Sequence, residues 1–291
     1  MATVAQWVAG ARPRTLPAAV TPVAVGTGVA AYEGSVQAGR AALALVVALA
    51  LQVGANYAND YSDGIRGTDE VRVGPVRLVG QRLAAPRAVR TAALASFAVA
   101  AVAGLVLVVL TAAWWLLAVG AASVVAAWLY TGGPRPYGYA GLGELFVFVF
   151  FGLVAVTGTA YVQTGSITWL AVTASVPTGL LICDVLVANN LRDIPGDAAV
   201  GKRTLAVRLG DARTRVMYVS LVGAAFAVTV GIVVVAPWAA LALVAAVLAV
   251  PPVRAVTSGA RGRDLIPVLQ ATGTLLLVHG VLLAVGLALS G

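Results

Sequence analysis

Cysteine and histidine are almost absent from this 291-residue sequence, which contains one of each. A single cysteine, Cys183, excludes an internal disulfide framework. With His279 as the lone histidine, the chain also offers no cluster of soft ligands for a zinc or iron centre. Charged residues are scarce too, at 10% of the chain. Any metal or phosphate chemistry must therefore depend on a few carboxylate, amide and basic groups.

Hydrophobic residues make up 60% of the sequence, and the mean hydropathy is +0.96. They occur in repeated stretches of about 20 residues, the length that crosses a bilayer as a helix. The runs are continuous rather than alternating, which favours helices over a membrane barrel. We expect an all-α integral membrane protein with a single transmembrane domain over residues 1–291. Residues 1–15 lack the apolar core of a signal peptide and are expected to form an interfacial segment.

Polar breaks divide the chain into nine predicted transmembrane helices. They cover residues 16–33, 40–59, 88–110, 112–130, 141–162, 167–189, 213–235, 237–254 and 264–289. With nine spans, all of the 19 basic residues except Arg40 fall on one side of the membrane. Lysine and arginine accumulate in cytoplasmic loops, so we expect a cytoplasmic N-terminus and an external C-terminus in the cell membrane. The net charge of +8 would then attract anionic membrane lipid, and no nucleic-acid partner is expected.

Two of the predicted cytoplasmic loops, residues 60–87 and 190–212, contain most of the acidic residues. The sequences at their starts, NYANDYSD and NNLRDIPGD, share one pattern. It is an asparagine, an aspartate four residues later and a second aspartate shortly after, at Asn56, Asp60 and Asp63 and again at Asn189, Asp193 and Asp197. Residues four apart lie on one face of a helix. Matching motifs four helices apart predict two related four-helix halves plus a ninth helix, with a site where the halves meet.

Two facing rows of carboxylates repel each other unless cations neutralise them. Carboxylate and amide oxygens suit Mg²⁺, which fills its other positions with water and phosphate oxygens. Basic residues that suit a polyphosphate accompany both rows: Arg66, Arg72, Arg77, Arg192, Lys202 and Arg203. Helix caps and topology charges would explain one such loop, but two matching loops favour a site. The sequence therefore predicts a site for a Mg²⁺-bound diphosphate at the cytoplasmic interface, with an apolar cavity behind it.

The motif sequences resemble those of a known family. NDYSDGIRGTD (59–69) and NNLRDIPGDAAVGKRTLAVRLG (189–210) are similar to the two signature loops of the UbiA-type intramembrane prenyltransferases. The branch that prenylates 1,4-dihydroxy-2-naphthoate in menaquinone biosynthesis is the most similar. It is also matched by ARPRTLPAAVTPVAVGTG (11–28), GPVRLV (74–79) and YTGGPRPYGYAGLGELFVFVFFG (130–152). Gly67 stands where a common first motif of the superfamily has an aspartate, which fits the naphthoate branch.

The resemblance implies a Mg²⁺-dependent transfer of a polyprenyl group from its diphosphate to 1,4-dihydroxy-2-naphthoate. The donor ionises to an allylic cation, which attacks the carboxylated ring carbon, and loss of CO₂ gives a product similar to demethylmenaquinol. The implied metal ligands are Asp60, Asp63, Asp193, Asp197, Asn56, Asn59 and Asn189. The diphosphate would contact Lys202 and Arg203 first, followed by Arg14, Arg72 and Arg77.

Other polar residues are weaker candidates. Asp69 and Asp184 are alternative bases for a naphthol hydroxyl, although Asp69 could instead be a metal ligand and Asp184 a packing residue inside the sixth helix. Four residues are expected to line the acceptor and prenyl cavity: Tyr130, Arg135, Glu144 and Asn190. Glu144 could equally cap a helix N-terminus, and Tyr130 could anchor the membrane interface.

Two other functions remain open on the sequence alone. The first is a prenyltransferase for another aromatic acceptor, such as a hydroxybenzoate. The second is a cation-coupled transporter, which would also have a repeat and a few buried acids, but would place them near the membrane midplane. Prenyl length and oligomeric state are not determined by the sequence.

Overall fold

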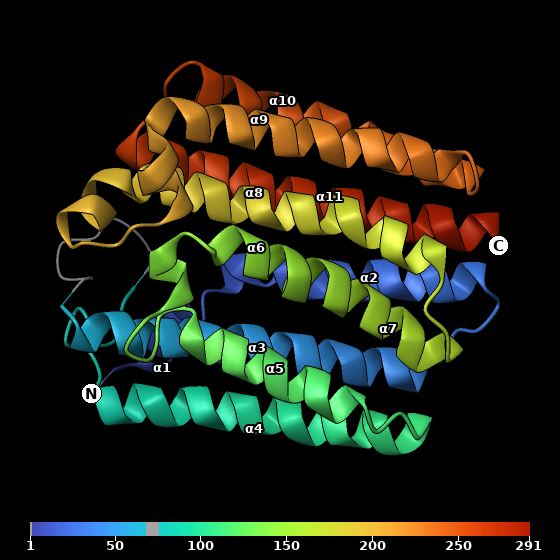
Figure 1. The fold of residues 1–291 in the computed structure, drawn as a ribbon, viewed down its shortest axis with the longest axis horizontal. Helices are drawn as coiled ribbons and strands as arrows, with labels where there is room; N and C mark the ends of the chain where they lie inside the picture. Colours follow the sequence, from blue (N-terminus) through green and yellow to red (C-terminus); the bar gives the residue numbers. More distant parts are fainter. Residues whose placement is uncertain (1, 68–75) are drawn as a thin grey trace.

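The computed structural model describes residues 2–67 and 76–291, and within these ranges the chain is helical without strands. Long helical segments run side by side along one axis, and the two termini lie at opposite ends of the bundle (Figure 1). In chain order the long segments are α2 (Pro17–Tyr32), α3 (Ala38–Ile65), α4 (Pro86–Thr111), α5 (Leu116–Leu129), the consecutive α6, η3 and α7 (Gly143–Val147, Phe148–Val154 and Ala155–Thr164), α8 (Trp169–Ala199), α9 (Leu205–Val233), η4 with α10 (Pro237–Ala245 and Ala246–Thr257) and α11 (Leu265–Ser290). The short segments are α1 (Val4–Gly10), η1 (Pro13–Thr15), η2 (Tyr137–Ala140) and η5 (Gly262–Asp264).

Within the described residues, 7 helices are long and apolar enough to cross a membrane on their own. The N-terminal segment Val4–Thr15 and α2 make an eighth candidate, with a bend of 48° between them. The remaining apolar helix, α5, is shorter, at 14 residues. The predicted all-helical membrane fold is confirmed, and nine spans agree with the structure when the bent pair and α5 are both counted.

The predicted ends of the second and sixth helices, residues 59 and 189, need correction. α3 continues to Ile65 and α8 continues to Ala199, so both acidic motifs lie in the last turns of helices rather than in loops. The prediction located the ends of the apolar runs. Polar residues can extend a helix where they are buried by neighbouring segments, and most residues of these two motifs are buried.

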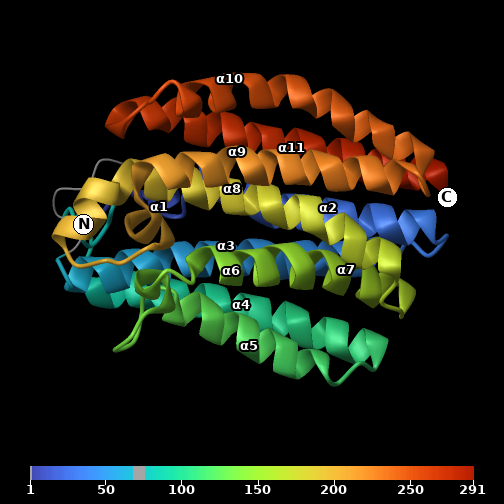
Figure 2. The ribbon, with the colours of Figure 1, turned by 45° about the horizontal axis from the view of Figure 1, so that its top comes forward.

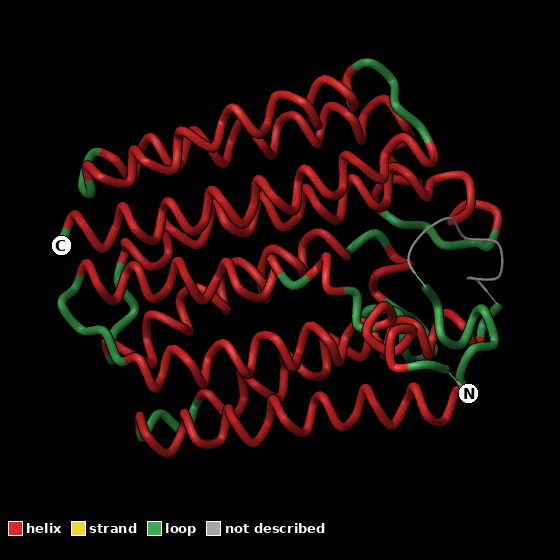
Figure 3. Tube along the Cα trace, turned by 180° about the vertical axis from the view of Figure 1, so that it is seen from behind, coloured by secondary structure: helices red, strands yellow, loops and turns green. Residues whose placement is uncertain are grey.

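The bundle has a central layer with a group of helices on either side. α2 lies in the middle and contacts α3, α7, α8 and α11 (Figures 1 and 2). α4 and α5 cover α3 on one side, while α9 and α10 flank α8 and α11 on the other. The longer connections gather at the end that holds the N-terminus (Figure 3). The C-terminal ends of α3 and α8 both lie at this end of the bundle.

A π-helical segment, η3, interrupts the helix between α6 and α7. It packs against α8 through two glycines: a β-carbon on Gly152 would lie 2.6 Å from the Cα atom of Gly179. Only residues without a side chain permit such close contact of two backbones. π-helical insertions are often found at functional sites, and this one lies between Glu144 and the outer part of the bundle.

Candidate active site

Both acidic motifs lie in the last turns of α3 and α8, at the end of the bundle that holds the N-terminus (Figure 1). The four aspartates are withdrawn from solvent: Asp60 is fully buried, and Asp63, Asp193 and Asp197 are at most 7% exposed. A buried carboxylate is costly unless it is paired or hydrogen-bonded. The partners of each aspartate therefore define the site.

Asp63 is one of the points at which the two halves of the chain touch. Its Oδ2 atom lies 3.0 Å from Nζ of Lys202, which comes from the connection after α8. Its Oδ1 atom accepts a hydrogen bond of 2.7 Å from the Tyr139 hydroxyl. The Tyr139 ring also lies against the lysine, 4.7 Å from the ring centroid to Nζ. One acidic motif is thus joined directly to the basic segment that follows the other.

Tyr139 was not predicted as a site residue, although its neighbours Tyr130 and Arg135 were. Its backbone carbonyl accepts a 3.1 Å hydrogen bond from the backbone N–H of Arg203. Arg66 stacks on its ring at 5.5 Å and donates to the carbonyls of Thr131 and Gly133. The sequence signal was available, because Tyr139 lies within the 130–152 stretch that resembles the family.

Asp193 is paired within its own motif. Arg192 donates through Nε and Nη2 to the two carboxylate oxygens, at 2.7 and 2.8 Å, and through Nη2 to Oδ1 of Asn189 at 2.8 Å. Both partners of the ion pair are buried, with side chains 4% and 7% exposed. Two-point contact of a guanidinium with a carboxylate is a strong and oriented interaction. Arg192 therefore pairs with Asp193 of the second row as Lys202 pairs with Asp63 of the first.

Three predicted metal ligands of the first motif have structural partners. Asp60 accepts hydrogen bonds from the backbone N–H groups of Leu78 and Val79, at 2.6 and 3.2 Å. The Asn56 amide donates to the Ala11 carbonyl and the Thr15 hydroxyl, both at 2.9 Å. Oδ1 of Asn59 accepts from the Thr131 hydroxyl at 2.9 Å. These side chains hold the N-terminal segment and the 76–80 and 131–142 segments around the end of α3.

The donor set suits a hard cation, because it consists of carboxylate and amide oxygens from two helices at one end of the bundle. In the described residues, no group of three acidic, histidine or cysteine side chains is arranged to hold a metal ion. Asp63 and Asp193 are instead satisfied by Lys202 and Arg192, which are also suitable partners for phosphate oxygens. The residue types therefore fit a divalent cation that binds together with a diphosphate.

The other predicted phosphate contacts differ in exposure. Arg77 is buried, at 5% exposure, next to the backbone that Asp60 binds. Arg14 and Arg203 are exposed, as is Arg135, which was predicted to line the acceptor cavity. Asp69 and Arg72 lie outside the described residues. Their predicted roles as base and phosphate ligand stay predictions.

Glu144 and Asn190 form a polar pair one helical turn deeper than Asp193. The Asn190 amide donates to Oε1 of Glu144 at 2.9 Å, and both side chains are buried. Tyr130 lies against the neighbouring Gly143, where a β-carbon would be 3.7 Å from its hydroxyl oxygen. Two of the four residues predicted to line the cavity, Glu144 and Asn190, are thus in direct contact. Arg135 is not shown in contact with them.

Asp184 lies on a different face of α8 from Asp193, and its role as a base stays a prediction. It is nine residues from Asp193, which places it half a turn out of phase on a helix of 3.6 residues per turn. Its carboxyl is fully buried without a hydrogen-bond partner among the described residues. It lies within electrostatic range of Tyr218, on the side where α8 packs against α9. This geometry supports the alternative reading of a packing residue.

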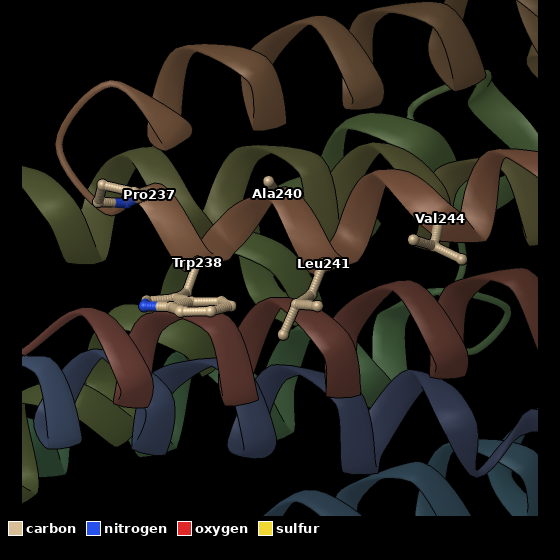
Figure 4. A pocket seen from close by; sticks show the side chains of 5 residues that line it. All are labelled: Pro237, Trp238, Ala240, Leu241 and Val244. Atoms are coloured by element: carbon tan, nitrogen blue, oxygen red, sulfur yellow. The ribbon is translucent and has the colours of Figure 1, made fainter.

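An apolar hollow of about 410 Å³ lies at the opposite end of the bundle, where η4 begins (Figures 1 and 4). It is lined by Pro237, Trp238, Ala240, Leu241 and Val244. It offers no charged group to a diphosphate. The predicted site and this hollow are therefore separate features.

Comparisons with known proteins agree with the geometry of the site. Residues 19–268 match the UbiA prenyltransferase family. The chain is 59% identical to the 1,4-dihydroxy-2-naphthoate octaprenyltransferase of Mycobacterium tuberculosis, over 99% of this chain and 98% of that protein. Among solved structures, the apo UbiA homologue from Aeropyrum pernix has a TM-score of 0.73 at 15% identity, covering 92% of this chain and 97% of that one.

A second solved structure shows the same fold with ligands. The UbiA homologue from Archaeoglobus fulgidus, bound to GPP and Mg²⁺, has a TM-score of 0.68 at 12% identity and covers 96% of this chain and 99% of that one. The family resemblance found in the sequence is confirmed. The polar residues also gather at one end of the bundle, unlike the midplane site of the transporter alternative. From its sequence match and its fold, this chain belongs to the UbiA prenyltransferase family.

Proposed function

We propose that the protein transfers a polyprenyl group from polyprenyl diphosphate to 1,4-dihydroxy-2-naphthoate, with release of pyrophosphate and CO₂. The observation that carries this proposal is the buried contact of Asp63 with Lys202 and Tyr139. It brings an acidic motif of one half together with the basic segment of the other. The name of the Mycobacterium tuberculosis relative supports the choice of acceptor.

Positive charge at the site would hold and neutralise the diphosphate. Lys202 and Arg192 are already placed on the two acidic rows, and a diphosphate would take over part of their pairing. A divalent cation, which we propose to be Mg²⁺, would be held mainly by Asp63, Asp193 and Asp197 and would supply further charge to the leaving group. Stabilising the departing pyrophosphate favours ionisation of the allylic C–O bond.

The acceptor ring would lie below the diphosphate, near the Glu144–Asn190 pair and Tyr130. The carboxylated ring carbon bonds to the allylic carbon as pyrophosphate leaves, and the carboxylate is then lost as CO₂. The electron pair of the broken C–C bond returns to the ring and restores its aromaticity. The prenyl tail would lie among the apolar helices, which is why a membrane fold suits this donor.

The site would face the cytoplasm of a plasma-membrane protein, as the distribution of basic residues predicts. Labelling with a membrane-impermeant thiol reagent in intact cells tests this, after Cys183→Ala removes the buried native cysteine. A cysteine at Gly165, between α7 and α8, should then react, and one at Gly259, between α10 and α11, should not. The reverse labelling pattern would contradict the orientation.

The proposed reaction is tested by prenyl transfer with the purified protein in detergent. A radiolabelled polyprenyl diphosphate would be incubated with 1,4-dihydroxy-2-naphthoate or with 4-hydroxybenzoate, each with Mg²⁺ or with EDTA. We expect Mg²⁺-dependent lipid product and CO₂ release with the naphthoate only. Product from hydroxybenzoate alone would overturn the proposed acceptor, and no transfer to either acceptor from folded protein would overturn the proposed reaction.

A further inference from the structure

Glu144 carries a carboxylate oxygen for which the protein provides no partner. Its Oε1 atom accepts the 2.9 Å hydrogen bond from Asn190, whereas Oε2 is buried without a hydrogen-bond partner among the described residues. The side chain is only 6% exposed. An ionisable group in this position inside a membrane protein is expensive, and it usually has a function. A hydrogen-bond donor on a bound substrate would supply the partner that the Oε2 atom lacks.

The position of Asn190 relates Glu144 to the diphosphate site. Asn190, Asp193 and Asp197 are spaced i, i+3 and i+7, so they lie along one face of α8. Asn190 is the deepest of the three, about one helical turn from Asp193. The reacting carbon of a prenyl diphosphate must also lie just below its phosphates. The unpaired oxygen of Glu144 is therefore near the level at which an acceptor ring meets that carbon.

The groups around Glu144 leave its Oε2 atom without a hydrogen-bond partner among the described residues. Glu144 lies in the first turn of α6, where the N–H groups of the helix end favour negative charge. The titratable group that contacts Glu144 is Cys183 of α8, which Asp184 follows in the helix, and Tyr130 lies against the neighbouring Gly143. The Cys183 thiol donates to the backbone carbonyl of Glu144 rather than to its side chain, at 3.2 Å. None of these groups donates a hydrogen bond to the Oε2 atom of Glu144.

We infer that Glu144 is the catalytic residue that accepts the proton of the acceptor's ring hydroxyl, with Asn190 as the residue that positions it. This inference rests on the proposed function. The O–H bond of the hydroxyl next to the carboxylated carbon breaks, and its proton moves to Oε2. The resulting phenolate directs its electron pair into the ring as the new C–C bond forms. After CO₂ leaves, the same oxygen recovers the proton from Glu144, so no external base is required.

Glu144→Gln tests the role, because the amide preserves the shape of the side chain but accepts no proton. We expect kcat to fall by about 10²- to 10⁴-fold at pH 7, with little change in the KM of the prenyl donor. A phenolic hydroxyl ionises with an ordinary pKa of about 10. The variant should therefore regain activity about tenfold per pH unit from pH 7 to 9, as more of the acceptor ionises in solution, while the unaltered enzyme gains much less.

Asn190→Leu tests the positioning role separately. It should lower kcat without producing the steep pH dependence, because Glu144 can still take the proton from a less favourable position. A change in the KM of the prenyl donor with kcat unaltered would contradict this role. Binding of a non-hydrolysable prenyl diphosphate analogue would show that each variant retains a folded donor site.

Glu33→Gln is the matched control, because Glu33 lies at the opposite end of the bundle, where it accepts a hydrogen bond from Thr168. It should leave kcat unchanged. If the unaltered enzyme transfers prenyl groups and Glu144→Gln stays within threefold of it, the inference fails while the proposed function stands. Loss of activity in Asp184→Asn but not in Glu144→Gln would also overturn it. Absence of transfer by the unaltered enzyme would instead count against the proposed function.

Discussion

Lys202 and Asp63 are oppositely charged side chains that are both almost removed from solvent, with 6% and 3% of their side-chain surface exposed. The burial of each charge is offset by the opposite charge beside it. A buried charge that loses its partner is destabilised far more than an exposed one, typically by about 3–5 kcal/mol. The pair therefore links the stability of the bundle to the composition of its active site.

Lys202→Met, alone and combined with Asp63→Asn, should separate the contribution of this pair to stability from its contribution to prenyl transfer. We expect a lower melting temperature in detergent, because Asp63 then loses the buried cation of Lys202, and we expect loss of prenyl transfer. The double variant Lys202→Met with Asp63→Asn should recover much of the stability, since neither member of the pair is then a buried charge. It should not recover transfer. Recovery of activity in the double variant would show that the pair has only a structural role.

At the scale of the elements, the sequence predicted where helices occur better than where they end. Continuous apolar runs located all the spans, but the last turns of α3 and α8 are polar, and their helical state depends on burial by other segments. Helical periodicity could have placed Asp184 opposite Asp193 if α8 had been predicted as one helix through residue 193. The helix predicted from the sequence instead ended at residue 189.

The contacts of the site were harder to foresee than its residue types. Matching motifs and adjacent basic residues predicted a two-part site. The contacts of Tyr139 with Asp63 and of Glu144 with Asn190 join segments 76 and 46 residues apart in the chain, so they depend on tertiary packing. The spacing of residues along the chain does not predict such contacts unless a repeat or a family resemblance indicates them.

The contact of η3 with α8 predicts a strong effect of a small substitution. Gly152→Ala would place a methyl group 2.6 Å from the Cα atom of Gly179, where backbone must move to admit it. We expect destabilisation of about 1–3 kcal/mol, together with reduced transfer because α8 carries the second acidic motif. Thermal unfolding in detergent and transfer assays measure the two effects.

Gly158→Ala is the matched control for this helix, because a β-carbon there meets nothing within 4 Å. Alanine is the better helix former, so Gly158→Ala should leave stability unchanged or raise it slightly. Equal melting temperatures for Gly152→Ala and Gly158→Ala would show that the close contact of η3 with α8 is unimportant.

For the molecule as a whole, we expect the proposed chemistry at the end that holds the two acidic motifs and a structural role for the other end. Arg40, the only basic residue predicted on the outer side, donates to the carbonyls of Val162 and Leu110, both at 2.9 Å. These carbonyls lie near the C-terminal ends of α7 and α4, where a cation is favourable. The guanidinium therefore ties three helices together far from the acidic motifs.

Arg40→Ala should accordingly lower the melting temperature while kcat per folded molecule stays the same. Two charge-assisted hydrogen bonds would be lost, at roughly 1–3 kcal/mol in total for a partly exposed group. Comparing thermal unfolding with transfer rates normalised to folded protein measures both quantities. A loss of kcat without a loss of stability would contradict the division of the molecule into a catalytic end and a structural end.

The central claim is that the acidic motifs of the two halves, joined through Lys202, form a single diphosphate site. The most direct test is equilibrium binding of a non-hydrolysable polyprenyl diphosphate analogue to the purified protein with Mg²⁺, comparing Asp63→Asn and Asp193→Asn with the unaltered chain. A single site predicts that each substitution weakens binding by at least tenfold and that EDTA abolishes it. Unchanged binding by either variant would contradict the claim, because one motif alone would then be sufficient to hold the diphosphate.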